Sequence, residues 1–230
     1  MLFDSVQVGA ADLSAAVRDL RLLLGRDGSP CRGLHRFALE RGAVEIVPGD
    51  AGVRSLRFRP EPGEAQPWAQ GREAYHGLEV LTDGEADAAP LAIAPDVPHA
   101  IDHVVIQSPD LDRAVRLWRD RLGMRLALDR DFPQRGLRLL FFRSGGVTLE
   151  FSGALGANPG EGPDRLWGIA YQVADLAACR ERLASAGVDV GGIRPGQKRG
   201  TLVATAKSHT LGVPTLLIQP GDDIAPASAG

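Results

Sequence analysis

The hydrophobic and polar positions of this chain follow one pattern that returns along its length. Short segments of alternating polarity, SVQVG (5–9), HVVIQ (103–107) and GIAYQV (168–173), have the period of two that is typical of strands. Each is followed by a segment with helical periodicity, at 11–25, 109–123 and 174–187. We expect N-caps at Asp12, Asp110 and Asp175, and helix ends at Gly25, Gly123 and Gly187.

Strand-like segments follow each helix, so the repeating unit is predicted to be βαβββ. Four units are expected, at about 1–50, 51–98, 99–156 and 163–221. In the second unit, the Pro/Gly-rich stretch 60–71 takes the place of the helix, so this unit is degenerate. The units predict two domains, a degenerate one over 1–98 and one with the expected pocket over 99–221, followed by a disordered tail at 222–230.

Composition narrows the classes of partner. The formal net charge of −3 gives no basic surface for nucleic acid, and no apolar run reaches the roughly 18 residues of a membrane span. The N-terminus has neither the basic region nor the apolar core of a signal peptide. Two distant cysteines, Cys31 and Cys179, fit a reducing compartment, and we expect a cytoplasmic protein.

Two segments carry a resemblance to a known family: DHVVIQSPDLDRAVRLWRDRLG (102–123) and GGVTLEF (145–151). The pattern resembles the vicinal oxygen chelate superfamily of glyoxalase I, bleomycin-resistance proteins, methylmalonyl-CoA epimerase and extradiol dioxygenases. The resemblance implies an α+β fold whose four βαβββ units pair into two open curled-sheet barrels. It also implies a divalent metal, such as Zn, Ni, Mn or Fe, held by the first and last strands of the paired units.

Alternation along two strands selects the candidate catalytic pair. His103 shares a face with Val105 and Gln107, opposite the apolar Val104 and Ile106, so it is expected to point into the barrel. On the strand at 147–151, Thr148 and Glu150 lie opposite the apolar residues. His103 and Glu150 match the metal-ligand positions of the superfamily, and an imidazole beside a carboxylate is half of a metal site or an acid–base pair.

The other half of the metal site is missing from the pattern. Gly168 stands at the position equivalent to His103, and Leu216 at the position equivalent to Glu150. Neither residue has a donor atom. In the first unit Ser5 occupies the histidine position, and Glu45 aligns with Glu150 only if a hairpin is shortened.

Further residues are assigned to the pocket by the same alternation. Gln107 and Gln172 are expected to hydrogen-bond a ligand, and Gly168 and Leu216 to widen the cavity. Arg138 is a candidate for an anionic group of the substrate. Trp167 and Tyr171 fall on the face opposite Gly168, where packing in the core is expected.

These observations favour a glyoxalase-like protein that binds a small molecule and has an incomplete metal site, with or without catalysis. The alternative is a metal-dependent lyase, isomerase or dioxygenase that uses His103 and Glu150, and a purely structural module is a third hypothesis. The identity of the ligand is left open, as are catalysis, metal binding, and the choice between a monomer and a homodimer.

Overall fold

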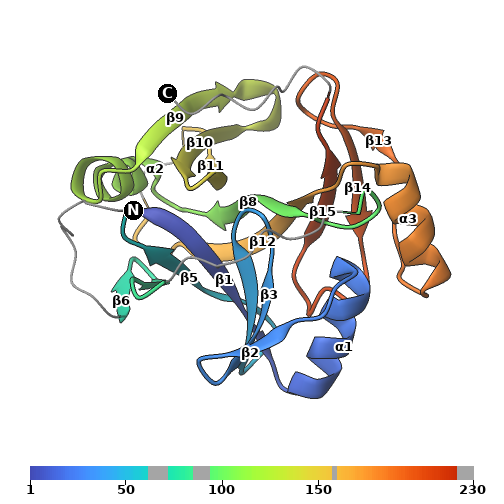
Figure 1. Ribbon diagram of the computed structural model, residues 1–230. Coiled ribbons are helices and arrows are strands. Elements are labelled where there is room, and N and C mark those ends of the chain that lie inside the picture. The colour runs from blue at the N-terminus through green and yellow to red at the C-terminus, as the bar shows by residue number, and fades with distance from the viewer. Residues whose placement is uncertain (62–71, 85–93, 157–159, 222–230) are drawn as a thin grey trace.

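The computed structural model describes residues 1–61, 72–84, 94–156 and 160–221. It has an α+β fold built from two curled mixed sheets and few helices (Figure 1). The predicted replacement of a helix by 60–71 lies mostly outside the described residues, and the tail at 222–230 lies wholly outside them.

The first sheet has seven strands in the order β2-β3-β4-β1-β5-β7-β6. Its strands are β1 (Leu2–Ala10), β2 (Ser29–Cys31), β3 (Leu34–Ala38), β4 (Ala43–Pro48), β5 (Gly52–Arg59), β6 (Arg72–Tyr75) and β7 (Leu78–Leu81). The first strand of each unit lies at the centre, where β1 pairs antiparallel with β5. Each of them also pairs in parallel with the last strand of its own unit, β1 with β4 and β5 with β7.

The second sheet repeats this arrangement with eight strands in the order β13-β14-β15-β12-β8-β11-β10-β9. Its strands are β8 (Ala100–Gln107), β9 (Arg125–Phe132), β10 (Leu137–Ser144), β11 (Val147–Ala154), β12 (Arg165–Gln172), β13 (Arg194–Pro195), β14 (Leu202–Ala206) and β15 (Thr215–Gln219). Again β8 and β12 pair antiparallel at the centre, and each pairs in parallel with the last strand of its unit. Neither strand order closes on itself among the described residues, so both barrels are open, as the sequence predicted.

The predicted helices are present with their predicted caps. In α1 (Leu13–Leu24), α2 (Leu111–Ala114) and α3 (Leu176–Ser185), the side chain of the preceding aspartate accepts a hydrogen bond from the third residue after it. The three glycines at the helix ends have φ values between 63° and 83°, which a residue without Cβ adopts at little cost.

The second helix is not regular, which the sequence pattern did not predict. Residues Val115–Arg121, which continue α2, are π-helical, and the N–H of Leu122 donates to the carbonyl of Leu117, five residues earlier. This segment carries Trp118, which is fully buried and contacts Phe151 of β11 and Phe58 of β5. The two sheets therefore share one hydrophobic core. Each sheet packs one face on this core, and its other face is the inner face of the curl.

The prediction for two aromatic residues was half right. Tyr171 is 2% exposed and lies in the core, but Trp167 is 48% exposed. The pairing of β12 with β8 shifts between Leu166 and Gly168, so Trp167 is the extra residue of a β-bulge. Strict alternation fails at a bulge, and this is why the expected burial of Trp167 was wrong.

Candidate functional site

The centre of the second sheet positions the predicted catalytic pair. Val104 and Ile106 of β8 are fully buried in the core, so the intervening residues His103, Val105 and Gln107 face the inner side of the curl. On β11, Leu149 and Phe151 face the core, which turns Thr148 and Glu150 to the same inner side. Register then sets neighbours, because Thr148 lies opposite His103, and Glu150 lies opposite Val105.

Two rows of side chains cross the inner face. The first row is Arg125, Arg143, Thr148, His103, Ala170 and Leu216. The second row is Leu128, Phe141, Glu150, Val105 and Gly168. The first row is therefore basic at one end, whereas Glu150 of the second row is bordered by apolar residues.

Both nitrogens of His103 face a carboxylate. Nδ1 lies 2.7 Å from Oδ1 of Asp102, and Nε2 lies 3.8 Å from Oε2 of Glu150. An ionised aspartate has no proton to donate, so Nδ1 of His103 is the donor and Nε2 is turned toward Glu150. Because 3.8 Å is too long for a hydrogen bond, both Nε2 and the Glu150 carboxylate are available to a third group.

Asp102 is also held by a chain of hydrogen bonds that involves its second carboxylate oxygen, the one that does not contact His103. The amide of Gln172 donates to Asp102, and the guanidinium of Arg41 donates to the amide oxygen of Gln172. Arg41 belongs to the turn between β3 and β4 of the first sheet, and its carbonyl accepts a hydrogen bond from the N–H of Ile101. Gln172, predicted to bind ligand, thus holds the imidazole through Asp102.

The environment raises the pKa values of Glu150 and His103 and lowers the pKa of Asp102. Burial raises the pKa of Glu150, and the charge of His103 opposes this shift only in part. Burial lowers the pKa of His103, but the hydrogen bond with Asp102 and the charge of Glu150 outweigh it, so the net pKa is raised. Burial raises the pKa of Asp102. The hydrogen bond and the charge of His103 lower it by more, so the net pKa is below its usual value and this carboxyl stays ionised.

The glutamate at the equivalent position of the first sheet, Glu45, is enclosed by ion pairs, unlike Glu150. Glu45 pairs with Gln7 as Glu150 pairs with Val105, so the two glutamates occupy the same place. The hairpin of β2 and β3 is shorter than the hairpin of β9 and β10, as this alignment requires. Glu45 is fully enclosed and bound by Arg36 at 2.7 Å, Arg57 at 3.2 Å and Gln7 at 2.9 Å. Burial raises its pKa, but the hydrogen bond from Gln7 and the two arginine charges together bring the pKa below its usual range. The inner face of the first sheet is therefore filled by an ionic network.

The inner face of the second sheet provides too few donors for a metal centre. His103 and Glu150 are two donors, and Nδ1 of the same histidine is taken by Asp102. A Cβ on Gly168 would lie 2.8 Å from the carbonyl oxygen of Pro214, so the packing of β15 leaves no room for a side chain there. Leu216 lies on the inner face opposite Ala170, and no group of three metal-binding side chains occurs among the described residues. These residues do not fit a three- or four-ligand centre.

The other residues predicted to bind substrate lie on two different faces of the second sheet. Gln107, Gly168 and Leu216 are on the inner face with His103. Arg138 is on the core side of β10, where its guanidinium binds Asp129 at 2.8 Å and Asp112 at 2.7 Å. These ion pairs raise the pKa of Arg138 further and neutralise its charge.

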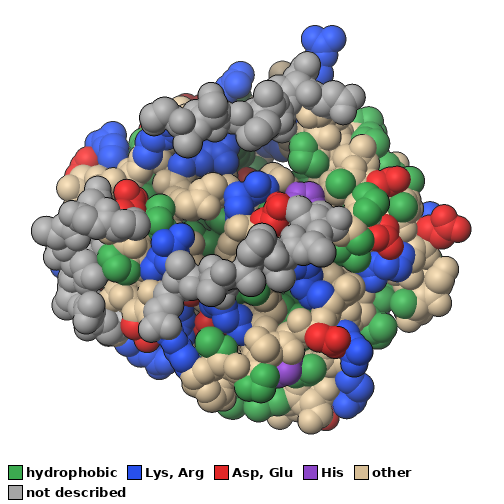
Figure 2. Space-filling view, viewed as in Figure 1, with side chains coloured by type: hydrophobic (Ala, Val, Ile, Leu, Met, Phe, Trp, Pro, Cys, Tyr) green, Lys and Arg blue, Asp and Glu red, His purple; other side chains and the backbone are tan. Residues whose placement is uncertain are grey.

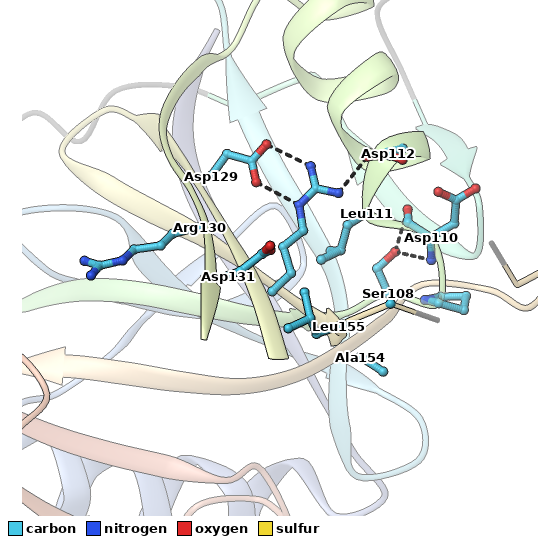
Figure 3. Close-up of a pocket in the computed structure, with 13 residues that line it drawn as sticks. Ser108, Asp110, Leu111, Asp112, Asp129, Arg130, Asp131, Ala154 and Leu155 are labelled. Carbon is cyan, nitrogen blue, oxygen red and sulfur yellow. Dashed lines mark hydrogen bonds and ion pairs between the residues drawn. The ribbon is translucent and has the colours of Figure 1, made fainter. Parts of the chain in front are cut away.

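Arg138 lines an open pocket of about 580 Å³ between the start of α2 and strands β9 and β11. Figure 3 shows the ion pairs of its guanidinium with Asp129 and Asp112, and Arg130 extending away from them. Neither His103 nor Glu150 lines this pocket. The structure therefore separates Arg138 from His103 and Glu150.

Three residues of the site were missed by the sequence reasoning. Asp102 falls at a shift in the pairing of β8 with β12, so its direction does not follow from alternation. Arg143 follows the alternation of β10 and lies in the row of His103, a signal that was available. Arg41 comes from the other sheet, and no local pattern brings it to Gln172.

A pH titration tests the environment of the imidazole. The pKa of His103, read from its ring proton signals in NMR, is expected above the ordinary value for histidine. Glu150→Gln and Asp102→Asn are each expected to lower it, because each removes a negative charge that stabilises the imidazolium. A pKa of His103 that is the same in wild type and in both variants would contradict the described geometry.

Comparisons with known proteins agree with this fold. A family model described as the glyoxalase/bleomycin resistance protein/dioxygenase superfamily matches residues 102–205. An ethylmalonyl-CoA/methylmalonyl-CoA epimerase from Cereibacter sphaeroides is 31% identical over 102 residues, which cover 40% of this chain and 74% of the relative.

Two solved structures are similar over nearly the whole chain. A halotolerant catechol dioxygenase has a TM-score of 0.70 at 14% identity, covering 99% of this chain and 90% of the other. The Mn(II)-bound glyoxalase from Novosphingobium aromaticivorans has a TM-score of 0.66 at 17% identity, covering 95% and 81%. At such identities the likeness concerns the fold alone, including the presence of both sheets.

Proposed function

This chain belongs to the glyoxalase/bleomycin resistance protein/dioxygenase superfamily, and we propose that it binds a small molecule on the inner face of the second sheet and moves a proton on it. The observation that carries this proposal is the pair of His103 and Glu150, 3.8 Å apart on that face. Asp102 orients the imidazole, and the partly buried glutamate has a raised pKa. A carboxyl and an imidazole poised in this way are suited to general acid–base chemistry.

The chemistry assigned to the pair is proton transfer at a carbon beside a carbonyl group. Glu150 in its ionised form takes the proton from carbon. His103 acts in its imidazolium form, which its raised pKa favours, and its Nε2–H on the same face donates to the oxygen that gains charge. The relative from Cereibacter sphaeroides supports this class, since it is named as an epimerase of two acyl-CoA thioesters. Epimerisation at such a carbon requires a proton to leave and to return.

Hydrogen exchange tests the proposal without knowledge of the natural substrate. Ethylmalonyl-CoA and methylmalonyl-CoA are incubated with the protein in D₂O, and deuterium at the carbon beside the thioester is measured by mass spectrometry. Catalysed incorporation above the rate without protein is expected. Incorporation at the background rate with both thioesters would count against proton transfer on this substrate class.

A second candidate is a metal-dependent enzyme of the same superfamily. It is favoured by His103 and Glu150, two donors on adjacent strands, and by the fold shared with a Mn(II)-bound glyoxalase. Near-stoichiometric metal in the purified protein, lost in His103→Ala and Glu150→Ala, would support this candidate.

A further inference from the structure

Four exposed arginines lie on the inner face of the second sheet: Arg125, Arg130, Arg143 and Arg165. Within the described ranges, no carboxylate lies at ion-pair distance from any of them. Basic side chains gather over β9, β10 and β11 in the space-filling view, beside a histidine and acidic side chains near the centre (Figure 2). The inner face is thus positively charged along one side of the catalytic pair.

Two of these arginines oppose each other. Arg125 of β9 and Arg143 of β10 are direct cross-strand partners. Like charges directly opposite one another destabilise a sheet, and an anion bound between them removes the repulsion. This pair therefore has the electrostatics of a site that is complete only with an anionic ligand.

Arg143 is also connected to the catalytic pair. Its guanidinium donates to Oγ1 of Thr148 at 2.6 Å, and Thr148 lies opposite His103 in the sheet. The charge of Arg143 acts on both His103 and Asp102. A ligand group held by Arg143 would therefore lie at the end of the row that contains His103.

The same strand provides a comparison within the molecule. Arg138 of β10 is neutralised by Asp112 and Asp129, whereas Arg143, five residues later, has the hydroxyl of Thr148 as its one side-chain partner among the described residues. A guanidinium without a carboxylate is available for bidentate binding of a carboxylate or phosphate.

We propose that the small molecule bound at this site carries an anionic group, a carboxylate or a phosphate, which Arg143 and Arg125 bind at the basic end of the row of His103. The proposal rests on the proposed function only for the location of the ligand. Arg143 and Arg125 are then the residues that select an anionic substrate, and Glu150 and His103 act on its neutral part.

Calorimetric titration tests this with three probes: malonate, inorganic phosphate, and malonamide as the neutral analogue of malonate. Saturable binding of malonate or phosphate is expected at low ionic strength, with weaker binding of malonamide. Arg143→Gln is expected to weaken anion binding at least about tenfold, since a charge-assisted bidentate contact is lost. Arg18→Gln, at an exposed position of α1, removes the same charge and is expected to leave binding unchanged.

Three results would overturn the proposal: no saturable binding of either anion, equal affinity of Arg143→Gln and Arg18→Gln, or malonamide binding as tightly as malonate. A preference for phosphate over malonate, or the reverse, identifies the anionic group and supports the proposal. Because binding is measured without turnover, a protein that fails the hydrogen-exchange test can still pass this one.

Discussion

Glu45→Ala is expected to lower the free energy of unfolding by about 2–4 kcal/mol, because it removes the carboxylate shared by two buried arginines and leaves a void. Arg36 keeps its pair with Asp4, and Arg57 keeps its pair with Asp83. Glu150→Ala is the matched control, since Glu150 occupies the same register position in the second sheet. It is expected to change stability by no more than about 1 kcal/mol, because its side chain is 22% exposed and no described residue holds it by a hydrogen bond.

The pH dependence of the two effects has opposite sign. The pKa of Glu45 is lower in the folded protein than in the unfolded chain, so its contribution is present above the unfolded pKa and is lost as pH falls through the folded pKa. The pKa of Glu150 is raised, so any stability linked to it is present at acidic pH and is lost as pH rises through the folded value. Urea unfolding of wild type and both variants from about pH 2 to about pH 8 measures this directly, because that range extends below and above the ordinary carboxyl pKa of about 4.3. Equal destabilisation by the two substitutions would show that the two inner faces do not differ as described.

Glu150→Gln is expected to slow hydrogen exchange at the reacting carbon by about 10²- to 10⁴-fold, the range typical for loss of a general acid–base group. Glutamine keeps the shape of the side chain but cannot accept the proton. The reduction is expected in kcat rather than in KM, because the proposal assigns substrate binding to Arg143 and Arg125 and not to Glu150. Glu181→Gln, the same substitution at an exposed position of α3, is the control and is expected to leave the rate unchanged.

Asp102→Asn separates positioning from proton transfer in the same assay. Asp102 contacts the imidazole and is assigned a positioning role, so a smaller loss of rate is expected, together with a shift of the pH profile to lower pH. Retention of the full rate in Glu150→Gln would assign the proton transfer to another group.

Local chemistry made most of the fold predictable. The aspartate caps and the glycines at the helix ends act within a few residues, so the sequence contains what determines them. The period of two placed His103 and Gln107 on the inner face because Val104 and Ile106 are both apolar and β8 is regular there.

Predictions failed or were incomplete where the backbone is irregular or where the interacting residues are distant in the sequence. The bulge at Trp167 and the shift at Asp102 break the alternation on which a face is assigned. The sequence predicts that Gly168 widens a cavity, but a Cβ there would lie 2.8 Å from the carbonyl oxygen of Pro214, the residue before β15. The enclosure of Glu45 by Arg36 and Arg57 depends on three strands at once, so its contrast with Glu150 was invisible in the sequence.

The contrast between these two glutamates is central to the proposed function. One position of the repeated unit is closed by arginines in the first sheet and left open beside an oriented histidine in the second. The first sheet thus supplies framework and, through Arg41, support for Gln172 and Asp102. The second sheet supplies His103 and Glu150, to which we assign the proton transfer.

The most direct test is the rate of deuterium incorporation into methylmalonyl-CoA by protein from which metal has been removed with a chelator. Acid–base chemistry by Glu150 and His103 predicts the same rate before and after metal removal, and loss of the rate in Glu150→Gln. A rate that disappears with the chelator and returns on addition of Mn²⁺ or Zn²⁺ would contradict it.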